Sequence, residues 1–189
     1  VLQSSGADLL VVTARTQGAR KDEHGISIFL VNAKADGVSL RAQKRVDSLN
    51  ANIVSFDNVQ VGSDALLGTL HEGMKALSPA LDKARIAMAT QMLGAAEQAF
   101  AMAVDYLKTR KQFGVAIGSF QALQHRATKL FVELELTRSA VMAAAACVDE
   151  DLEKVPMMAS LAKAIPKKSA LARRQENLSD WIIRFTGKS

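Results

Sequence analysis

The chain has 189 residues, 49% hydrophobic and 23% charged, which is typical of a globular protein with a substantial core. Its one cysteine, Cys147, excludes an internal disulfide and fits a reducing compartment, and its three histidines lie too far apart in sequence to suggest a metal site. The formal net charge is +5, but residues 164–189 hold six basic and two acidic residues, so the rest of the chain is close to neutral. This distribution argues against a nucleic-acid-binding domain, and no run of about 18 uncharged apolar residues predicts a transmembrane helix.

The first third of the chain, residues 1–66, has the pattern of short strands. Runs of valine, isoleucine and leucine alternate with turn-forming residues, and this spacing is typical of antiparallel strands. We expect strands at residues 8–14, 26–31, 38–46, 52–56 and 59–61, the last two separated by a turn at Asp57 and Asn58. Their close spacing favours an antiparallel sheet or barrel over parallel βαβ units.

From residue 67 the pattern becomes helical. Apolar residues recur with a period near 3.6 over residues 78–111 and again over 119–148, which predicts two long helices. Ser78 with Pro79 suits the start of the first helix. A polar break over residues 149–156 precedes a third helix beginning near Met157, and Pro166 is expected to break or kink that helix.

The link between the two long helices, residues 110–121, carries an unusual set of side chains. Arg110 can make two parallel hydrogen bonds to a phosphate, while glutamines offer both donors and acceptors and phenylalanines pack on flat rings. The combination indicates a nucleotide-cofactor pocket at the corner of an antiparallel helix pair. The alternative is an ordinary helix end, at which Arg110 is a solvated cation favoured by the helix dipole.

These residues also carry a resemblance to a known family. The R-x-Q-F-G sequence from Arg110 to Gly114, followed by Phe120 and Gln121, resembles a signature of the acyl-CoA dehydrogenase flavoproteins. Four further segments match the family in order and spacing, and all lie before Arg110 in the chain, at residues 7–15, 54–61, 67–73 and 81–85 with Gly94. The resemblance runs from Val1 to about Lys163. It implies an α+β fold with a middle β-barrel-like domain at 1–66, a helical bundle domain at 67–163 and a divergent basic tail at 164–189, the first two incomplete.

The resemblance implies a function and a set of site residues. Family members oxidise acyl-CoA thioesters to 2-enoyl-CoA with FAD, and members commonly pass electrons to an electron-transfer flavoprotein. By position, Arg110 would contact the FAD diphosphate, on a neighbouring subunit. Asp82 and Arg85 would contact the CoA part of the substrate, although two residues three apart on a helix also make an ordinary surface ion pair. The adenine–diphosphate end of FAD would be lined by Gln112, Phe113 and Gln121.

No residue of this sequence matches the family's catalytic base. Some family members carry a catalytic glutamate on the first long helix, and the matching position here is Ala84. We therefore expect this chain alone not to dehydrogenate acyl-CoA, and we expect it to be a fragment of a homo-oligomer, a dimer or tetramer in full-length form. The expected location is the cytoplasm of a bacterium or the matrix of a mitochondrion. A non-catalytic partner subunit and an acyl-CoA oxidase remain alternatives, and the acyl-chain length is not determined.

Overall fold

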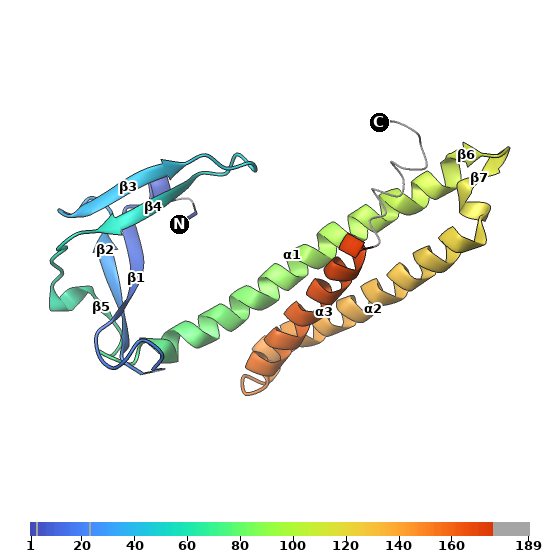
Figure 1. The fold of residues 1–189 in the computed structure, drawn as a ribbon. Helices are drawn as coiled ribbons and strands as arrows, with labels where there is room; N and C mark the ends of the chain where they lie inside the picture. The colour runs from blue at the N-terminus through green and yellow to red at the C-terminus, as the bar shows by residue number, and fades with distance from the viewer. Residues whose placement is uncertain (3, 23, 176–189) are drawn as a thin grey trace. The chain divides into compact units, whose positions relative to one another are not determined.

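The computed structural model describes residues 1–175 apart from Gln3 and Glu23, with side chains up to Ile165. The chain divides into two compact units, Val1–Ser78 and a second unit that begins at Pro79. The first contains antiparallel strands and the second contains long helices (Figure 1). This arrangement confirms the α+β class expected from the sequence. No helix among the described residues is long and apolar enough to cross a membrane.

The first unit is built from two small antiparallel sheets. Strand β2 lies between β1 and β5, and strands β3 and β4 form a separate hairpin (Figure 1). Leu10 of β1 and Ile28 and Val31 of β2 are buried. Ile28 and Val31 lie three residues apart and so on opposite faces of β2, which is the central strand of this sheet. The strands are β1 (Leu9–Arg15), β2 (Ile26–Asn32), β3 (Val38–Gln43), β4 (Ala51–Phe56) and β5 (Leu66–Leu67).

A ring of hydrogen bonds ties the loop before the first helix to the sheet. His71 donates its backbone N–H to the Ser27 hydroxyl over 2.8 Å, and the Thr16 hydroxyl lies 2.8 Å from His71 Nδ1 and 2.6 Å from the Ser27 hydroxyl. Ser27 is fully buried, so these bonds satisfy a hydroxyl that has no access to water. The next element begins at Gly73, where a side chain would come within 2.9 Å of the Ile26 carbonyl oxygen. The helix start is therefore fixed on β2.

The strand predictions differ from the structure in three details. The predicted strand at residues 59–61 is absent, because β4 ends at Phe56 and the chain turns away at Asn58, which has a φ of 51°. The backbone returns to the sheet only at β5, a short pairing with β2 that the sequence pattern did not show. Strand β3 stops at Gln43 although the alternation continues to Val46, because the residues that follow form the loop to β4 and have no partner strand.

The second unit packs three helices around a shared apolar core: α1 (Gly73–Thr109), α2 (Gln121–Glu150) and α3 (Val155–Gln175). All three helices contribute residues three, four or seven positions apart, which fall on one face of each helix. Several core positions are alanines with no exposed surface, including Ala144 of α2 and Ala159 and Ala162 of α3. The buried members of the core are Ile86, Ala89, Leu93, Leu134, Val141, Ala144, Val155, Ala159 and Ala162.

The helix boundaries depart from the prediction at two prolines. Helix α1 begins at Gly73 and continues through Pro79, so Ser78 and Pro79 do not form its first turn. Pro79 cannot donate to the helix ladder, and the division between the two units falls at this position. Helix α3 continues through Pro166 to Gln175, so the expected break there is not found. The part of the predicted basic tail at 176–189 lies outside the described residues.

Candidate functional site

The link from α1 to α2 is a small β-hairpin followed by a single 3₁₀ turn. Strands β6 (Lys111–Gln112) and β7 (Val115–Ala116) pair with each other, and the 3₁₀ turn Ile117–Ser119 leads into α2 (Figure 1). The hairpin loop consists of Phe113 and Gly114, with φ angles of 53° and 80°. Two consecutive residues with positive φ are the pattern of a type I′ turn, which matches the twist of the paired strands. The sequence predicted the corner but not the hairpin within it.

Arg110 lies at the base of this hairpin, one residue beyond α1. Its backbone N–H donates to the Tyr106 carbonyl over 2.9 Å, and its carbonyl accepts the Ile117 N–H over 2.8 Å. The side-chain Nε is buried and has no hydrogen-bond partner among the described residues. A buried donor without an acceptor is costly, because it has lost its water and gained nothing in return. The site therefore presents an arginine donor that is suited to an anionic ligand.

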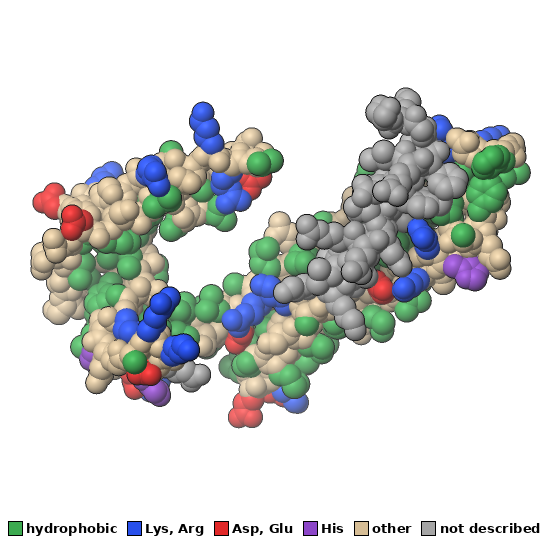
Figure 2. Space-filling model, in the orientation of Figure 1, with side chains coloured by type: hydrophobic (Ala, Val, Ile, Leu, Met, Phe, Trp, Pro, Cys, Tyr) green, Lys and Arg blue, Asp and Glu red, His purple; other side chains and the backbone are tan. Residues whose placement is uncertain are grey.

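The other predicted cofactor residues lie on the same hairpin or at the start of α2. Gln112 is half-buried on β6, whereas Phe113 is 84% exposed at the tip, and Gln121 is exposed in the first turn of α2. The Phe113 ring meets Phe120 edge to face, with ring centroids 6.2 Å apart. Hydrophobic side chains gather on the surface at this end of the α1–α2 pair (Figure 2). The corner thus places amides and an exposed aromatic ring near Arg110.

The predicted substrate pair lies near the other end of α1. Asp82 is buried, with 5% of its surface exposed, because it continues the stripe of Ile86 and Ala89 that faces the core. Arg85 donates from Nη1 to the Asp82 carboxylate, and about half of the arginine side chain remains in water. Ala84, at the position of the alternative base, is an exposed helix residue. The structure brings Asp82 and Arg85 together as expected.

The two groups of predicted residues are far apart. Asp82 and Arg110 are 28 positions apart in sequence, and α1 is continuous between them. At 1.5 Å per residue this separation is about 40 Å along the helix. Within one chain the two ends of α1 therefore cannot contact the same small part of a ligand.

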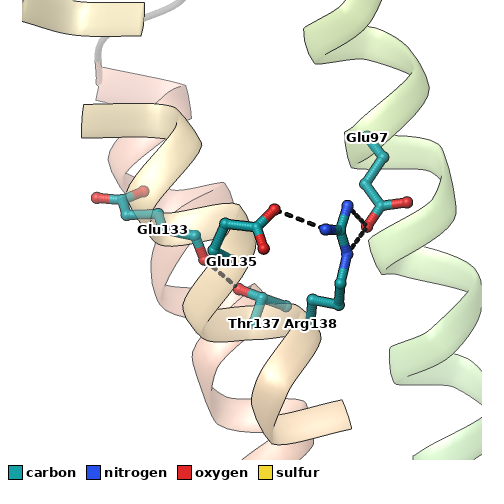
Figure 3. Close-up of polar contacts among 5 residues, drawn as sticks. All are labelled: Glu97, Glu133, Glu135, Thr137 and Arg138. Atoms are coloured by element: carbon teal, nitrogen blue, oxygen red, sulfur yellow. Dashed lines mark hydrogen bonds and ion pairs between the residues drawn. The ribbon is translucent and has the colours of Figure 1, made fainter. Parts of the chain in front are cut away.

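A polar cluster that the sequence analysis did not identify fastens α1 to α2. Arg138 of α2 lies between Glu97 of α1, at 2.9 Å, and Glu135 of its own helix, at 2.7 Å (Figure 3). The hydrogen bond that Arg138 donates to the Glu97 carboxylate raises the pKa of Arg138 above its ordinary value. The three-residue spacing of Glu135 and Arg138 was the available signal, but the partner on α1 cannot be read from sequence. These groups are partly exposed, so the cluster adds little stability and we assign it no ligand.

Glu133 lies beside this cluster but does not join it. Its side chain points away from Arg138 (Figure 3), and its Oε2 is buried without a partner among the described residues. The nearby Thr137 hydroxyl donates to the Glu133 backbone carbonyl over 2.7 Å and not to this oxygen.

Comparison with known proteins identifies the family. The acyl-CoA dehydrogenase C-terminal domain matches residues 71–173, more than half of the chain and beyond the point near Lys163 where the sequence resemblance was expected to end. The chain belongs to the acyl-CoA dehydrogenase family, whose members are FAD-dependent oxidoreductases.

Individual relatives agree with this assignment. The chain is 35% identical over 117 residues to the bovine mitochondrial short/branched chain specific acyl-CoA dehydrogenase, covering 60% of this chain and 27% of the relative. It is 31% identical over 160 residues to a subunit of the caffeyl-CoA reductase–Etf complex of Acetobacterium woodii, covering 82% and 41%. The structure of butyryl-CoA dehydrogenase from Megasphaera elsdenii superposes with a TM-score of 0.82 at 29% identity, covering 93% and 46%. The chain spans less than half the length of each of these proteins.

Proposed function

We propose that this chain is part of an FAD-dependent acyl-CoA dehydrogenase and that its α1–α2 corner binds the diphosphate end of the flavin. The observation that carries the proposal is the buried Arg110 Nε without a hydrogen-bond partner among the described residues. A diphosphate oxygen is the acceptor that such a donor suits, and the exposed amide of Gln121 adds hydrogen-bonding capacity at the same corner. The residues present therefore fit the adenine–diphosphate part of FAD.

The bound flavin would supply the redox chemistry, since FAD accepts a hydride from the β-carbon of an acyl-CoA thioester. The role of this chain is to bind and orient. Arg110 would neutralise diphosphate charge, while Gln112, Phe113 and Gln121 would contact the adjoining adenine end. Because Arg110 and Asp82 are about 40 Å apart along α1, we assign Arg110 to the flavin of a neighbouring subunit in a homo-oligomer.

The substrate end of the proposal rests on Asp82 and Arg85. Arg85 keeps part of its guanidinium in water while paired with the buried Asp82, so it can hydrogen-bond a polar group of the CoA moiety without losing its fixed orientation. Ala84 supplies no carboxylate to remove the α-proton, so we expect no dehydrogenation by this chain alone. We place the protein in the cytoplasm or the mitochondrial matrix, with an electron-transfer flavoprotein as electron acceptor. The relative from an Etf complex supports that partner.

A pair of binding measurements tests the two site assignments against each other. Flavin retained after gel filtration is measured first, by absorbance, and FAD and acyl-CoA affinities are then compared in Arg110→Gln and Arg85→Gln. Loss of one charge-assisted hydrogen bond corresponds to about a tenfold or greater loss of affinity. We expect Arg110→Gln to weaken FAD binding and Arg85→Gln to weaken acyl-CoA binding only. Equal FAD affinity in the parent and Arg110→Gln would contradict the cofactor assignment.

A further inference from the structure

We propose that the 3₁₀ turn Ile117–Ser119 is the element that positions Arg110, and that Gly118 and Gln124 are the positioning residues that hold this turn in place. Neither residue belongs to the group assigned to the cofactor. The inference deepens the proposed function and rests on it for the identity of the ligand, but the structural coupling between the turn and Arg110 is independent of that identity.

Gly118 brings the turn into direct contact with the last part of α1. A Cβ atom at this position would lie 2.8 Å from the Leu107 carbonyl oxygen and 3.2 Å from the carbonyl carbon. Its φ lies outside the left-handed region, so glycine is needed here for space and not for backbone conformation. Because the obstacle is backbone and not a mobile side chain, any larger residue must push the turn away from α1.

Gln124 holds the same turn from the side of α2. Its Nε2 donates to the Gly118 carbonyl over 3.0 Å, across the start of the helix. The Ser119 hydroxyl donates to the Ala116 carbonyl over 2.7 Å and closes the turn on β7. The turn is thus fixed between α1, α2 and the hairpin by contacts from different elements.

The turn is coupled to Arg110 through one backbone hydrogen bond. Ile117, which is 7% exposed, donates its N–H to the Arg110 carbonyl over 2.8 Å. Arg110 is past the end of α1, so this bond and the one to Tyr106 are what fix its backbone direction. A displacement of the turn is therefore passed to the Arg110 backbone, and a ligand-binding group must be held to about 0.5 Å to be effective.

Two variants and two matched controls test the coupling on the full chain. Gly118→Ala crowds the turn, and Gln124→Leu removes its bond to α2. Gly94→Ala, which has open space around its Cβ, and Gln98→Leu, an exposed site on α1, make the same changes elsewhere. The readouts are amide exchange at Ile117 and the NMR signal of the Arg110 Nε–H. We expect exchange at Ile117 to be about tenfold faster and the Arg110 signal to shift in both variants and in neither control.

The outcomes separate this inference from the proposed function. Unchanged Ile117 exchange and an unchanged Arg110 signal in both variants overturn the positioning role, as does faster exchange spread evenly over α1 and α2, which reports general destabilisation. FAD is then titrated into the same proteins and into Arg110→Gln. If the two variants shift the Arg110 signal but Arg110→Gln binds FAD like the parent, the cofactor assignment fails and the positioning role stands. If Arg110→Gln weakens FAD binding while the two variants leave the Arg110 signal and FAD binding unchanged, the cofactor assignment stands and the positioning role fails.

Discussion

The arginines at the two ends of helix α1 differ in whether the chain supplies their side chains with hydrogen-bond partners. Near its start, Arg85 is paired with a buried aspartate three residues earlier, so both charges are satisfied within the chain. Beyond its end, Arg110 has a buried Nε with no acceptor among the described residues, although its backbone is hydrogen-bonded on both sides. One arginine serves the fold and can serve a ligand as well, whereas the other is costly to the fold unless a ligand binds.

This difference shows which observation supports a binding site. A satisfied ion pair has the same appearance whether it binds a substrate or merely stabilises a helix, so the geometry of Asp82 and Arg85 does not separate these two roles. A buried donor without a partner destabilises the fold, so its presence calls for a functional explanation. Phe113 is a similar case, since it is a bulky residue with positive φ at an exposed position.

Removing Arg85 should have the largest effect on stability. In Arg85→Leu the buried carboxylate of Asp82 loses its partner, and we expect the free energy of unfolding to fall by about 2 kcal/mol. Urea denaturation followed by circular dichroism measures the change. Lys83→Leu, an exposed lysine on the same helix turn, is the matched control and should stay within about 0.5 kcal/mol of the parent. Equal stability of the two variants would mean that the pair does not stabilise this end of α1.

Relieving the strained hairpin tip should have a smaller and opposite effect. Asparagine tolerates a positive φ better than phenylalanine, so Phe113→Asn should raise the free energy of unfolding by about 0.5 kcal/mol after the loss of the Phe120 contact. The same variant should bind FAD more weakly. Val115→Asn, on the adjacent strand, has no such strain to relieve and should not stabilise the chain. A destabilised Phe113→Asn would show that the ring serves the fold.

Removing Arg110 should leave stability nearly unchanged. In Arg110→Leu the relief of an unsatisfied buried donor, about 1 kcal/mol, is offset by the loss of a cation at a helix C-terminus, about 0.5 kcal/mol. We therefore expect a free energy of unfolding within about 0.5 kcal/mol of the parent, measured in urea beside Arg85→Leu. A loss as large as that of Arg85→Leu would remove the contrast between the two ends of α1.

The smallest effect is expected at the surface ion pair of Arg45 and Asp47 in the β unit, whose side chains are 40% and 42% exposed. Hydrogen bonds from the Arg45 guanidinium hold the pKa of Asp47 at about 2, below its ordinary value of 3.8. Because the folded pKa is lowered, the contribution of this pair is present above pH 4 and is lost only as the pH falls through about 2. An NMR titration of the Asp47 carboxyl carbon should show this, and Arg45→Gln should return the midpoint toward 3.8. A midpoint near 3.8 in the parent would contradict the pairing.

The sequence predicted the parts of the fold that depend on periodicity. The three helices and the strands β1 to β4 follow from apolar spacing, since each buries a regular face. Strand β5 and the hairpin of β6 and β7 were missed because two-residue strands have no period to detect. The two prolines do not end their helices: a proline removes one backbone donor from the helix ladder, and α1 and α3 each continue past that gap.

The sequence predicted which residues form the candidate site, but not their burial, hydrogen-bond partners or close contacts. Spacing placed Asp82 and Arg85 on one face of a helix and Arg110 at its end. It could not show that Asp82 is buried, that Arg110 Nε has no partner among the described residues, or that Gly118 lies against the Leu107 carbonyl. Each of these facts depends on contacts between different elements, or between residues brought together by a turn, and therefore on the folded structure.

The alanines between α2 and α3 limit how the sequence can diverge. Ala144, Ala159 and Ala162 have no exposed surface, so the two helices leave no room there for a longer side chain. Exposed neighbours such as Met142 and Met157 meet no such limit within the described chain. A library randomised at all five positions and selected for folding should therefore retain alanine, glycine or serine at the first three, while the two methionine positions accept most residue types. The contact between α2 and α3 thus restricts which residue types these positions can accept, whether or not a ligand is bound.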